Sequence, residues 1–278
     1  MSRLNLSAEE SVGHPGIGHL VRSEVLKIRS TRLWWALLLG AILLVMVQAG
    51  FTAAFEGQDQ GFGETSVLPS GDSPELVRTV YTQGFFAGYI FALILGITGL
   101  TGEYRYQTIT PTFLVAPKRY PIVVAKIVAH LFFGVLYGVA CTAAAIVAGG
   151  IVLVAKGFDF GLTAEGVPRA LATSVLAMAL WTIFGIGVGT LIKNQIAAIL
   201  VGVAVAYIVE PLLGLVLSVL EIEAVGKYLP TAASTGLFES FSYGQSLLAW
   251  WQGGLVLIAY ACLFALLGVL LSVRRDIT

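Results

Sequence analysis

Long stretches without a single charged residue dominate this sequence. Five such stretches cover residues 33–55, 79–102, 127–155, 170–192 and 240–273, and a sixth, 194–220, holds one charge, Glu210. Lys, Arg, Asp and Glu each cost about 3 kcal/mol at the centre of a membrane helix, so charge-free runs mark the places where a chain can cross a bilayer. Each run reaches the roughly 20 residues that span the hydrocarbon core. We therefore expect six transmembrane helices.

The composition supports a membrane protein and argues against a soluble one. Hydrophobic residues make up 57% of the 278 residues, charged residues only 12%, and the mean hydropathy is +0.88. Soluble domains carry about 25% charged residues. Because lipid offers the backbone no hydrogen bonds, a spanning segment must be a helix or part of a closed barrel, and runs of this length favour helices. The expected fold class is an all-α integral membrane protein.

The basic residues predict the orientation. With both termini in the cytoplasm, 12 of the 16 Lys and Arg residues fall in cytoplasmic segments, while most acidic residues fall outside. The positive-inside rule selects this arrangement. We expect a flexible cytoplasmic N-terminus at 1–16, a membrane domain at 32–273 and a cytoplasmic C-terminus at 274–278.

An amphipathic pattern precedes the first span, at residues 17–31. Apolar residues recur there at helical spacing, and Arg22, Lys27 and Arg29 are available to the polar side. This pattern predicts an interfacial helix. Two roles stay open from the pattern alone: a basic helix that only anchors to anionic head groups, or a helix whose outer face also contacts a partner.

The segment between the second and third spans is polar, basic and rich in proline. It reads GEYRYQTITPTFLVAPKRYPIVVAK over residues 102–126. Thr110 can cap a short helix that Pro111 begins and Pro117 ends. Such an element would suit docking of a partner at the membrane surface, but a solvated loop that serves only the positive-inside rule fits the same residues.

Polar and small residues elsewhere give further expectations. Ser73 can cap a helix that begins at Pro74 and runs into the second span. Residues 228–238 and the first part of the run 240–273 are expected outside the membrane or re-entrant, because that run is longer than one crossing needs. Gly185, Gly187 and Gly189, and the spaced pair Gly134 and Gly138, are expected to let helices pack closely. We expect these glycines to serve packing and not chemistry.

Glu210 is the one formal charge within a predicted span. Intramembrane acids are functional candidates by default, so it is a candidate for a cargo path or an intramembrane polar site. The alternatives are a protonated carboxyl at a break caused by Pro211, or an acid at the outer end of a shorter fifth span. His130, about one turn into the third span, is expected at the level of the head groups.

The segment between the second and third spans carries a resemblance to a known family. The residues that carry it are Glu103, Arg105, Thr108, Ile109, Pro117, Lys118, Arg119 and Lys126. Their order resembles that of the permease subunits of bacterial type 2 ABC exporters. The sequence EYRYQTITPTFL is similar to the corresponding sequence of actinobacterial members. Gln107 departs from the pattern, because the family often has Gly there, and this leaves the local turn unassigned.

The resemblance implies a division of labour between subunits. A coupling helix would contact a cytoplasmic ATPase through Glu103, Arg105, Thr108, Phe113, Leu114, Lys118 and Arg119. Residues 17–31, with Arg22, Lys27 and Arg29, would form the connecting helix beside it. Two ATPase subunits would bind ATP and Mg²⁺, because this chain contains no G-x-x-x-x-G-K-[ST] sequence and so no ATP site of its own. We expect no cofactor or metal in this chain.

The implied function is a transmembrane permease of a bacterial cell membrane that exports a hydrophobic or amphipathic compound such as a drug, antibiotic or lipid. The expected partners are a second permease subunit, which would form a homodimer, and membrane lipids. We expect no nucleic acid partner. One alternative is a proton-coupled secondary transporter that uses Glu210, although no internal repeat supports it. A second is an intramembrane hydrolase, which the near absence of histidine in the spans disfavours.

Overall fold

The computed structural model describes residues 16–58, 68–69, 71, 73–107, 119–238 and 247–274, and every regular element in these ranges is a helix. Six of the helical segments are long and apolar enough to cross a membrane. They are Leu33–Ala54, Pro74–Arg105, Tyr120–Ala155, Val167–Leu191, Gln195–Val219 and Trp250–Leu267. The predicted six-span, all-helical fold class is confirmed.

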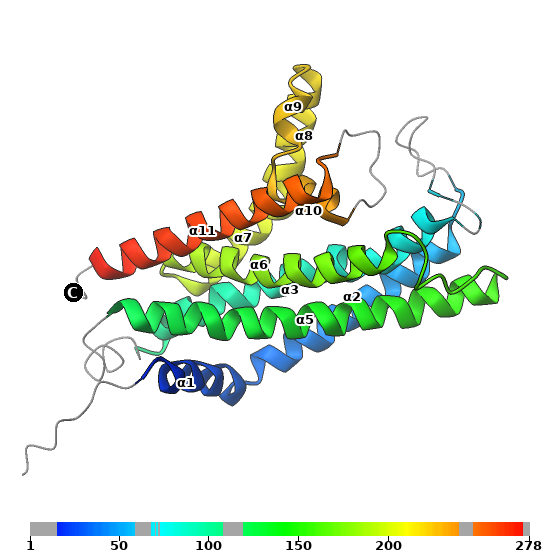
Figure 1. Cartoon of the computed structure of the whole chain (residues 1–278). Helices are drawn as coiled ribbons and strands as arrows, with labels where there is room; N and C mark the ends of the chain where they lie inside the picture. The colour runs from blue at the N-terminus through cyan, green and yellow to red at the C-terminus, as the bar shows by residue number, and fades with distance from the viewer. Residues whose placement is uncertain are drawn as a thin grey trace, which may run out of the picture.

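The interfacial helix α1 (Ile17–Ser30) lies at one end of the bundle and leads into the first span, α2 (Leu33–Ala54). The second and third spans, α3 (Pro74–Arg105) and α5 (Arg119–Ala155), run the length of the bundle beside α2. The last span, α11 (Trp250–Arg274), ends at the same end as α1 (Figure 1). The chain returns to this end because the number of crossings is even. The end of α3 and the start of α5 lie at the same end, beside α1.

The second span begins as the sequence predicts. Pro74 occupies its first turn, and the Ser73 hydroxyl accepts a hydrogen bond from the Leu76 backbone N–H at 3.1 Å. This bond satisfies one of the four N–H groups that every helix start leaves without an intrahelical partner.

The second span packs closely against the fourth span, α6 (Val167–Leu191). A Cβ on Gly96 would lie 2.0 Å from the Thr182 carbonyl oxygen, and one on Gly185 would lie 2.1 Å from that of Leu93. Gly134 of α5 is similarly close to α6, where a Cβ would lie 2.6 Å from the Cα of Ala179. The expectation that Gly134 and Gly185 serve helix packing is confirmed, because larger residues would force the backbones apart.

Aromatic side chains fill the middle of the bundle. Tyr89 and Trp181 pack edge to face with ring centroids 4.5 Å apart, and Phe85 packs against Phe238 at 4.8 Å. All four residues are buried. This cluster joins α3, α6 and the short helix α10 (Pro230–Phe238), which lies between the fifth and sixth spans.

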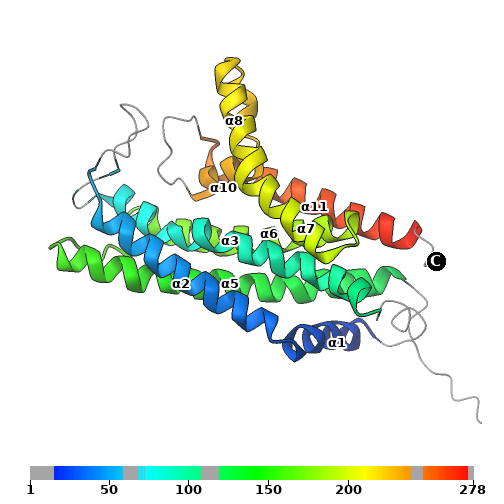
Figure 2. The same cartoon turned by 180° about the vertical axis from the view of Figure 1, so that it is seen from behind.

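The fifth span is bent away from the bundle. It consists of α7 (Gln195–Ala204), a π-helical turn (Val205–Val209) and α8 (Glu210–Val219). A proline at position 211 and the π-turn before it are recognised causes of a kink. Figure 1 shows α8 and the short α9 (Glu223–Gly226) projecting from the other helices, and Figure 2 shows α8 from behind, with α10 back beside the bundle. Helix α10 lies in the segment that was expected outside the membrane or re-entrant, and its Ala233, Gly236 and Leu237 are buried. Whether it re-enters the membrane stays a prediction.

Candidate functional site

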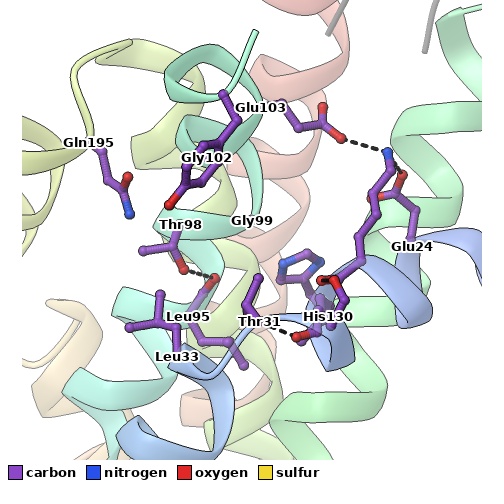
Figure 3. A pocket seen from close by; sticks show the side chains of 14 residues that line it. Glu24, Thr31, Leu33, Leu95, Thr98, Gly99, Gly102, Glu103, His130 and Gln195 are labelled. Carbon is purple, nitrogen blue, oxygen red and sulfur yellow. Dashed lines mark hydrogen bonds and ion pairs between the residues drawn. The ribbon is translucent and has the colours of Figure 1, made fainter. Parts of the chain in front are cut away.

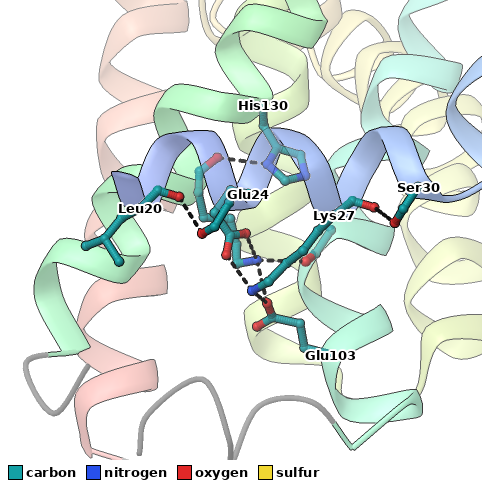
Figure 4. Close-up of polar contacts among 9 residues, drawn as sticks. Leu20, Glu24, Lys27, Ser30, Glu103 and His130 are labelled. Atoms are coloured by element: carbon teal, nitrogen blue, oxygen red, sulfur yellow. Dashed lines mark hydrogen bonds and ion pairs between the residues drawn. The ribbon is translucent and has the colours of Figure 1, made fainter. Parts of the chain in front are cut away.

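Four alternating charges tie α1 to the adjoining ends of α3 and α5 (Figure 4). The Lys126 Nζ of α5 lies 2.6 Å from a carboxylate oxygen of Glu24 and 3.0 Å from one of Glu103. The Lys27 Nζ of α1 lies 2.6 Å from Glu24 and 2.8 Å from Glu103. Each carboxylate therefore contacts both ammonium groups. We refer to Glu24, Lys27, Glu103 and Lys126 as the charge cluster.

The cluster is buried on one side and open on the other. The side chains of Lys126 and Glu24 are 3% and 4% exposed, and that of Glu103 is 9% exposed, whereas that of Lys27 is 40% exposed. Lys126 also donates to the Gly99 carbonyl at 3.0 Å, so its ammonium has three acceptors. The charges balance, and removing one partner of such a buried pair costs about 3–5 kcal/mol.

The ionisation of Glu24 reflects this environment. Burial alone would raise its pKa, but the nearby ammonium groups of Lys126 and Lys27 outweigh burial, so the pKa of Glu24 lies below its ordinary value. Glu24 therefore stays negatively charged at neutral pH. An ionised Glu24 keeps α1 attached to α5 through its contact with Lys126.

His130 lies one turn beyond Lys126 on α5 and is buried, with 1% of its surface exposed. Its Nδ1 lies 2.8 Å from the Lys126 carbonyl oxygen. Because a carbonyl only accepts, Nδ1 carries the proton and donates. Nε2 is buried without a hydrogen-bond partner. Helix α1 covers this turn of α5, so His130 is enclosed by protein, and its expected depth at the level of the head groups stays a prediction.

A pocket of 320 Å³ adjoins the cluster, between α1, α3, α5 and the start of α7. Figure 3 shows Glu103 and His130 on one side of it and Gln195 on the other, with Thr98 and Leu95 between them. Ile28 and Leu33 add apolar surface. The pocket thus combines an apolar wall with a small number of polar groups.

The comparison with protein families covers the helices that form this site. A family model described as ABC-2 family transporter protein matches residues 20–210, which extends from α1 to the start of α8. The chain belongs to this family. It is an ABC-2 permease, a membrane component of an ABC transporter and not itself the ATPase. A search of curated proteins gives no match.

Two of the predicted coupling residues of the permease, Glu103 and Arg105, lie in described helices and contact other residues of the chain. Glu103 points into the charge cluster, so its carboxylate already has partners within the chain. Arg105 is exposed, and its guanidinium donates to the Gln195 side chain at 3.2 Å, which joins α3 to α7. Contacts of either residue with an ATPase stay predictions.

The other predicted coupling residues give less information. Thr108, Phe113, Leu114 and Lys118 lie outside the described residues, as does the expected coupling helix itself. Arg119 begins α5, and its side chain is outside the described part of the chain. On α1, Arg22 and Arg29 are exposed, whereas Lys27 belongs to the charge cluster. Arg22 and Arg29 therefore leave their charges on the outer face of the permease.

Glu210 lies at the bend of the fifth span and is buried, with 7% exposed. Its carboxylate accepts a hydrogen bond from the Thr231 backbone N–H, in the first turn of α10. An acid at a helix N-terminus is favourable, because it satisfies free N–H groups and complements the helix dipole. This contact supports a structural role, in which Glu210 holds α10 against the bend. The cargo and proton-transfer roles stay untested.

Sequence reasoning missed Glu24, the residue on which the cluster depends. It lies four residues after Leu20 and four before Ile28, so it sits on the apolar stripe of α1. An acid on the buried face of an amphipathic helix predicts a basic partner on the element beneath, since buried charges are paired. That signal points to a partner but does not say which lysine, because Lys126 is 102 residues away.

Proposed function

We propose that this permease exports a hydrophobic or amphipathic compound across a bacterial cell membrane, driven by ATP hydrolysis in a separate cytoplasmic ATPase. Two ATPase subunits would bind ATP and Mg²⁺, and two permease subunits would form the pathway. The membership of the ABC-2 family supports an ATPase partner in general. The distribution of basic residues supports cytoplasmic termini, and with them the α1 end of the bundle would lie on the ATPase side.

The charge cluster is the observation that carries the proposal. It joins the interfacial helix to the end of α3 and the start of α5, the two spans that the predicted coupling helix, 111–117, connects along the chain. Movement of the ATPase at this end of the bundle reaches α3 and α5 only if α1 and both spans move together. Ion pairs that share two carboxylates resist separate movement of any one helix, because each displacement exposes unpaired buried charge.

The exposed surface around the cluster suits an ATPase contact. Arg22 and Arg29 on α1 and Arg105 at the end of α3 leave basic groups on the outer face. Exposed charges of this kind set the rate and register of association more than its affinity. We propose that they orient the ATPase, while the predicted coupling helix, 111–117, supplies the main contact.

The projecting α8 suits a second permease subunit. Leu212, Leu215 and Val219 of α8 are 55%, 61% and 75% exposed. In a membrane this apolar surface can face lipid or another subunit, and the bend at the π-turn directs it away from its own bundle. We propose that two copies pair along this side, with cargo passing between them near the two Glu210 residues.

The test is transport in proteoliposomes that contain the permease and its ATPase. A panel of fluorescent amphipathic dyes supplies the cargo, and an ATPase variant without hydrolytic activity is the control. We expect ATP-dependent dye movement that needs both subunits. Dye movement driven by a proton gradient without the ATPase would contradict the proposal and favour the secondary transporter that uses Glu210.

A further inference from the structure

The pocket of 320 Å³ beside the charge cluster contains hydrogen-bond donors that the described chain does not use fully. Two of the residues that line it, Lys27 of α1 and Gln195 of α7, come from different helices. The Lys27 Nζ contacts two carboxylates, Glu24 at 2.6 Å and Glu103 at 2.8 Å, and an ammonium group has three N–H bonds. Its side chain is 40% exposed. One N–H of Lys27 can therefore serve a ligand.

Gln195 presents a second donor because Arg105 fixes the orientation of its amide. An Arg side chain only donates, so the 3.2 Å contact of the Arg105 Nη1 places the amide oxygen of Gln195 toward Arg105. The amide nitrogen is then not buried and makes no hydrogen bond within the described structure. Arg105 is exposed, and its other N–H groups lie beside this nitrogen. Guanidinium and amide donors together suit an oxyanion such as a phosphate.

The charge around the pocket is positive once the internal pairs are subtracted. Glu24 and Glu103 line the pocket, but each carboxylate contacts both Lys27 and Lys126, so these four charges sum to zero. Arg105 remains, and no described carboxylate forms an ion pair with it. An anionic head group would balance this charge. The ammonium of a zwitterionic head group would find both carboxylates of the pocket already paired.

The floor of the pocket is apolar and adjoins the first span. Ile28, Leu33 and Leu95 line it, and Leu33 is 39% exposed where α2 begins. Figure 3 shows Leu33 and Leu95 together, away from Glu103 and Gln195. A water-soluble phosphate would leave this apolar surface uncovered, whereas an acyl chain would cover it. The adjoining leaflet is therefore the direct source of the ligand.

We propose that this pocket binds the phosphate head group of an anionic phospholipid. The phosphate oxygens accept from Lys27, Arg105 and Gln195, and the first part of an acyl chain lies on Leu33 and Leu95. Basic pockets between membrane helices bind anionic head groups in other proteins. A bound head group would contact α1, α3 and α7 at once, beside the charge cluster. Glu210 of the proposed cargo path does not line the pocket, so binding requires neither cargo nor the ATPase.

The test uses the purified permease in phosphatidylcholine vesicles and needs neither ATPase nor transport. The probe is phosphatidylglycerol that carries a diazirine near the start of one acyl chain, and labelled peptides are located by mass spectrometry. We expect saturable labelling within 28–33 and 95–106, competed by unlabelled phosphatidylglycerol. Phosphatidylcholine with the same diazirine should label these segments weakly, because its ammonium has no free carboxylate to meet.

Two variants and a matched control test the contacts. Arg105→Gln removes a charged donor and should weaken apparent affinity about tenfold, the effect of one lost charge-assisted hydrogen bond. Arg22→Gln removes a charge that is also exposed at this end of the protein but lies outside the pocket, and should have a much smaller effect. Gly102→Phe should also reduce labelling, because Gly102 lines the pocket. A Cβ there meets no atom within 4 Å, so the new side chain takes pocket space without displacing its neighbours.

Two competitors identify the source of the phosphate. Excess inorganic phosphate, or water-soluble glycerophosphoglycerol, should not compete with the probe, because neither covers the apolar floor. Competition by either would show that the site takes a free phosphate group and would overturn the assignment to a lipid. Equal labelling by the phosphatidylcholine probe, equal effects of Arg105→Gln and Arg22→Gln, or wild-type labelling of Gly102→Phe would each overturn the proposal as well.

Discussion

The Lys126 ammonium of α5 and the Glu24 carboxylate of α1 lie 2.6 Å apart, although 102 residues separate them in the chain. Both side chains are almost fully buried. This pair, completed by Glu103 and Lys27, is the main polar link between the interfacial helix and the membrane bundle in the described structure. Its energetic weight can be measured directly.

Replacing Lys126 with Met should destabilise the permease by about 3–5 kcal/mol, because Glu24 and Glu103 would lose a buried partner. Lys156→Met is the matched control at the other end of the bundle, where Lys156 lies 3.3 Å from Glu56 and is 33% exposed. It should cost less than about 1 kcal/mol. Thermal unfolding in detergent measures the stability of both variants. Equal losses of stability would show that the charge cluster contributes no more than an exposed ion pair.

The pH dependence of stability should reveal the ionised state of Glu24. Its pKa is lower in the folded protein than the ordinary 4.5, so its ionisation stabilises the fold fully above that value. This contribution is lost as the pH falls through the lowered pKa. The stability difference between wild type and Glu24→Gln should therefore be largest near neutral pH and shrink below pH 4.5. A difference that grows on acidification would contradict the assignment.

Substitutions at Glu210 separate its possible roles. Glu210→Gln keeps an oxygen that accepts the Thr231 N–H, so assembly and most transport should survive. Glu210→Leu leaves that N–H without its acceptor, and should cost about 1–3 kcal/mol and loosen α10. Transport by reconstituted variants gives the answer. A Gln variant that assembles fully but does not transport would instead support proton transfer through Glu210.

The orientation is open to a labelling experiment in a background that lacks Cys141 and Cys262. A cysteine at Val225, which is 51% exposed on α9, should react with an impermeant thiol reagent in intact cells. A cysteine at Ser30, exposed at the end of α1, should react only after the membrane is opened. The opposite pattern would reverse the proposed topology.

The sequence predicted the six spans because charged residues are nearly excluded from the hydrocarbon core, and this signal is local to each segment. The Ser73 cap and the close packing of Gly185 were also predictable from local sequence. Each depends on a residue type with one strong physical preference. The start of the last span was not predictable, because the run 240–273 carries no charge that marks its beginning. The structure begins α11 at Trp250.

The candidate site was predicted only in part. Glu103, Lys27 and Lys126 stood out as charged residues near span ends, but their pairing depends on how α1 packs against α5, which no local pattern records. The burial of His130 follows from the same packing. A break at Pro211 was one of the alternatives for Glu210, whereas the contact of Glu210 with Thr231 depends on the return of α10 to the bundle.

If the charge cluster passes movement of the ATPase to the spans, ATP hydrolysis in the assembled transporter should depend on the cluster. The measurement is the increase in ATPase rate on adding cargo to proteoliposomes of wild type, Glu24→Gln and Lys156→Met. We expect Glu24→Gln to bind the ATPase but lose most of the cargo-stimulated rate, and Lys156→Met to match wild type. If Glu24→Gln retains the full stimulation with the complex intact, the cluster does not couple the two subunits.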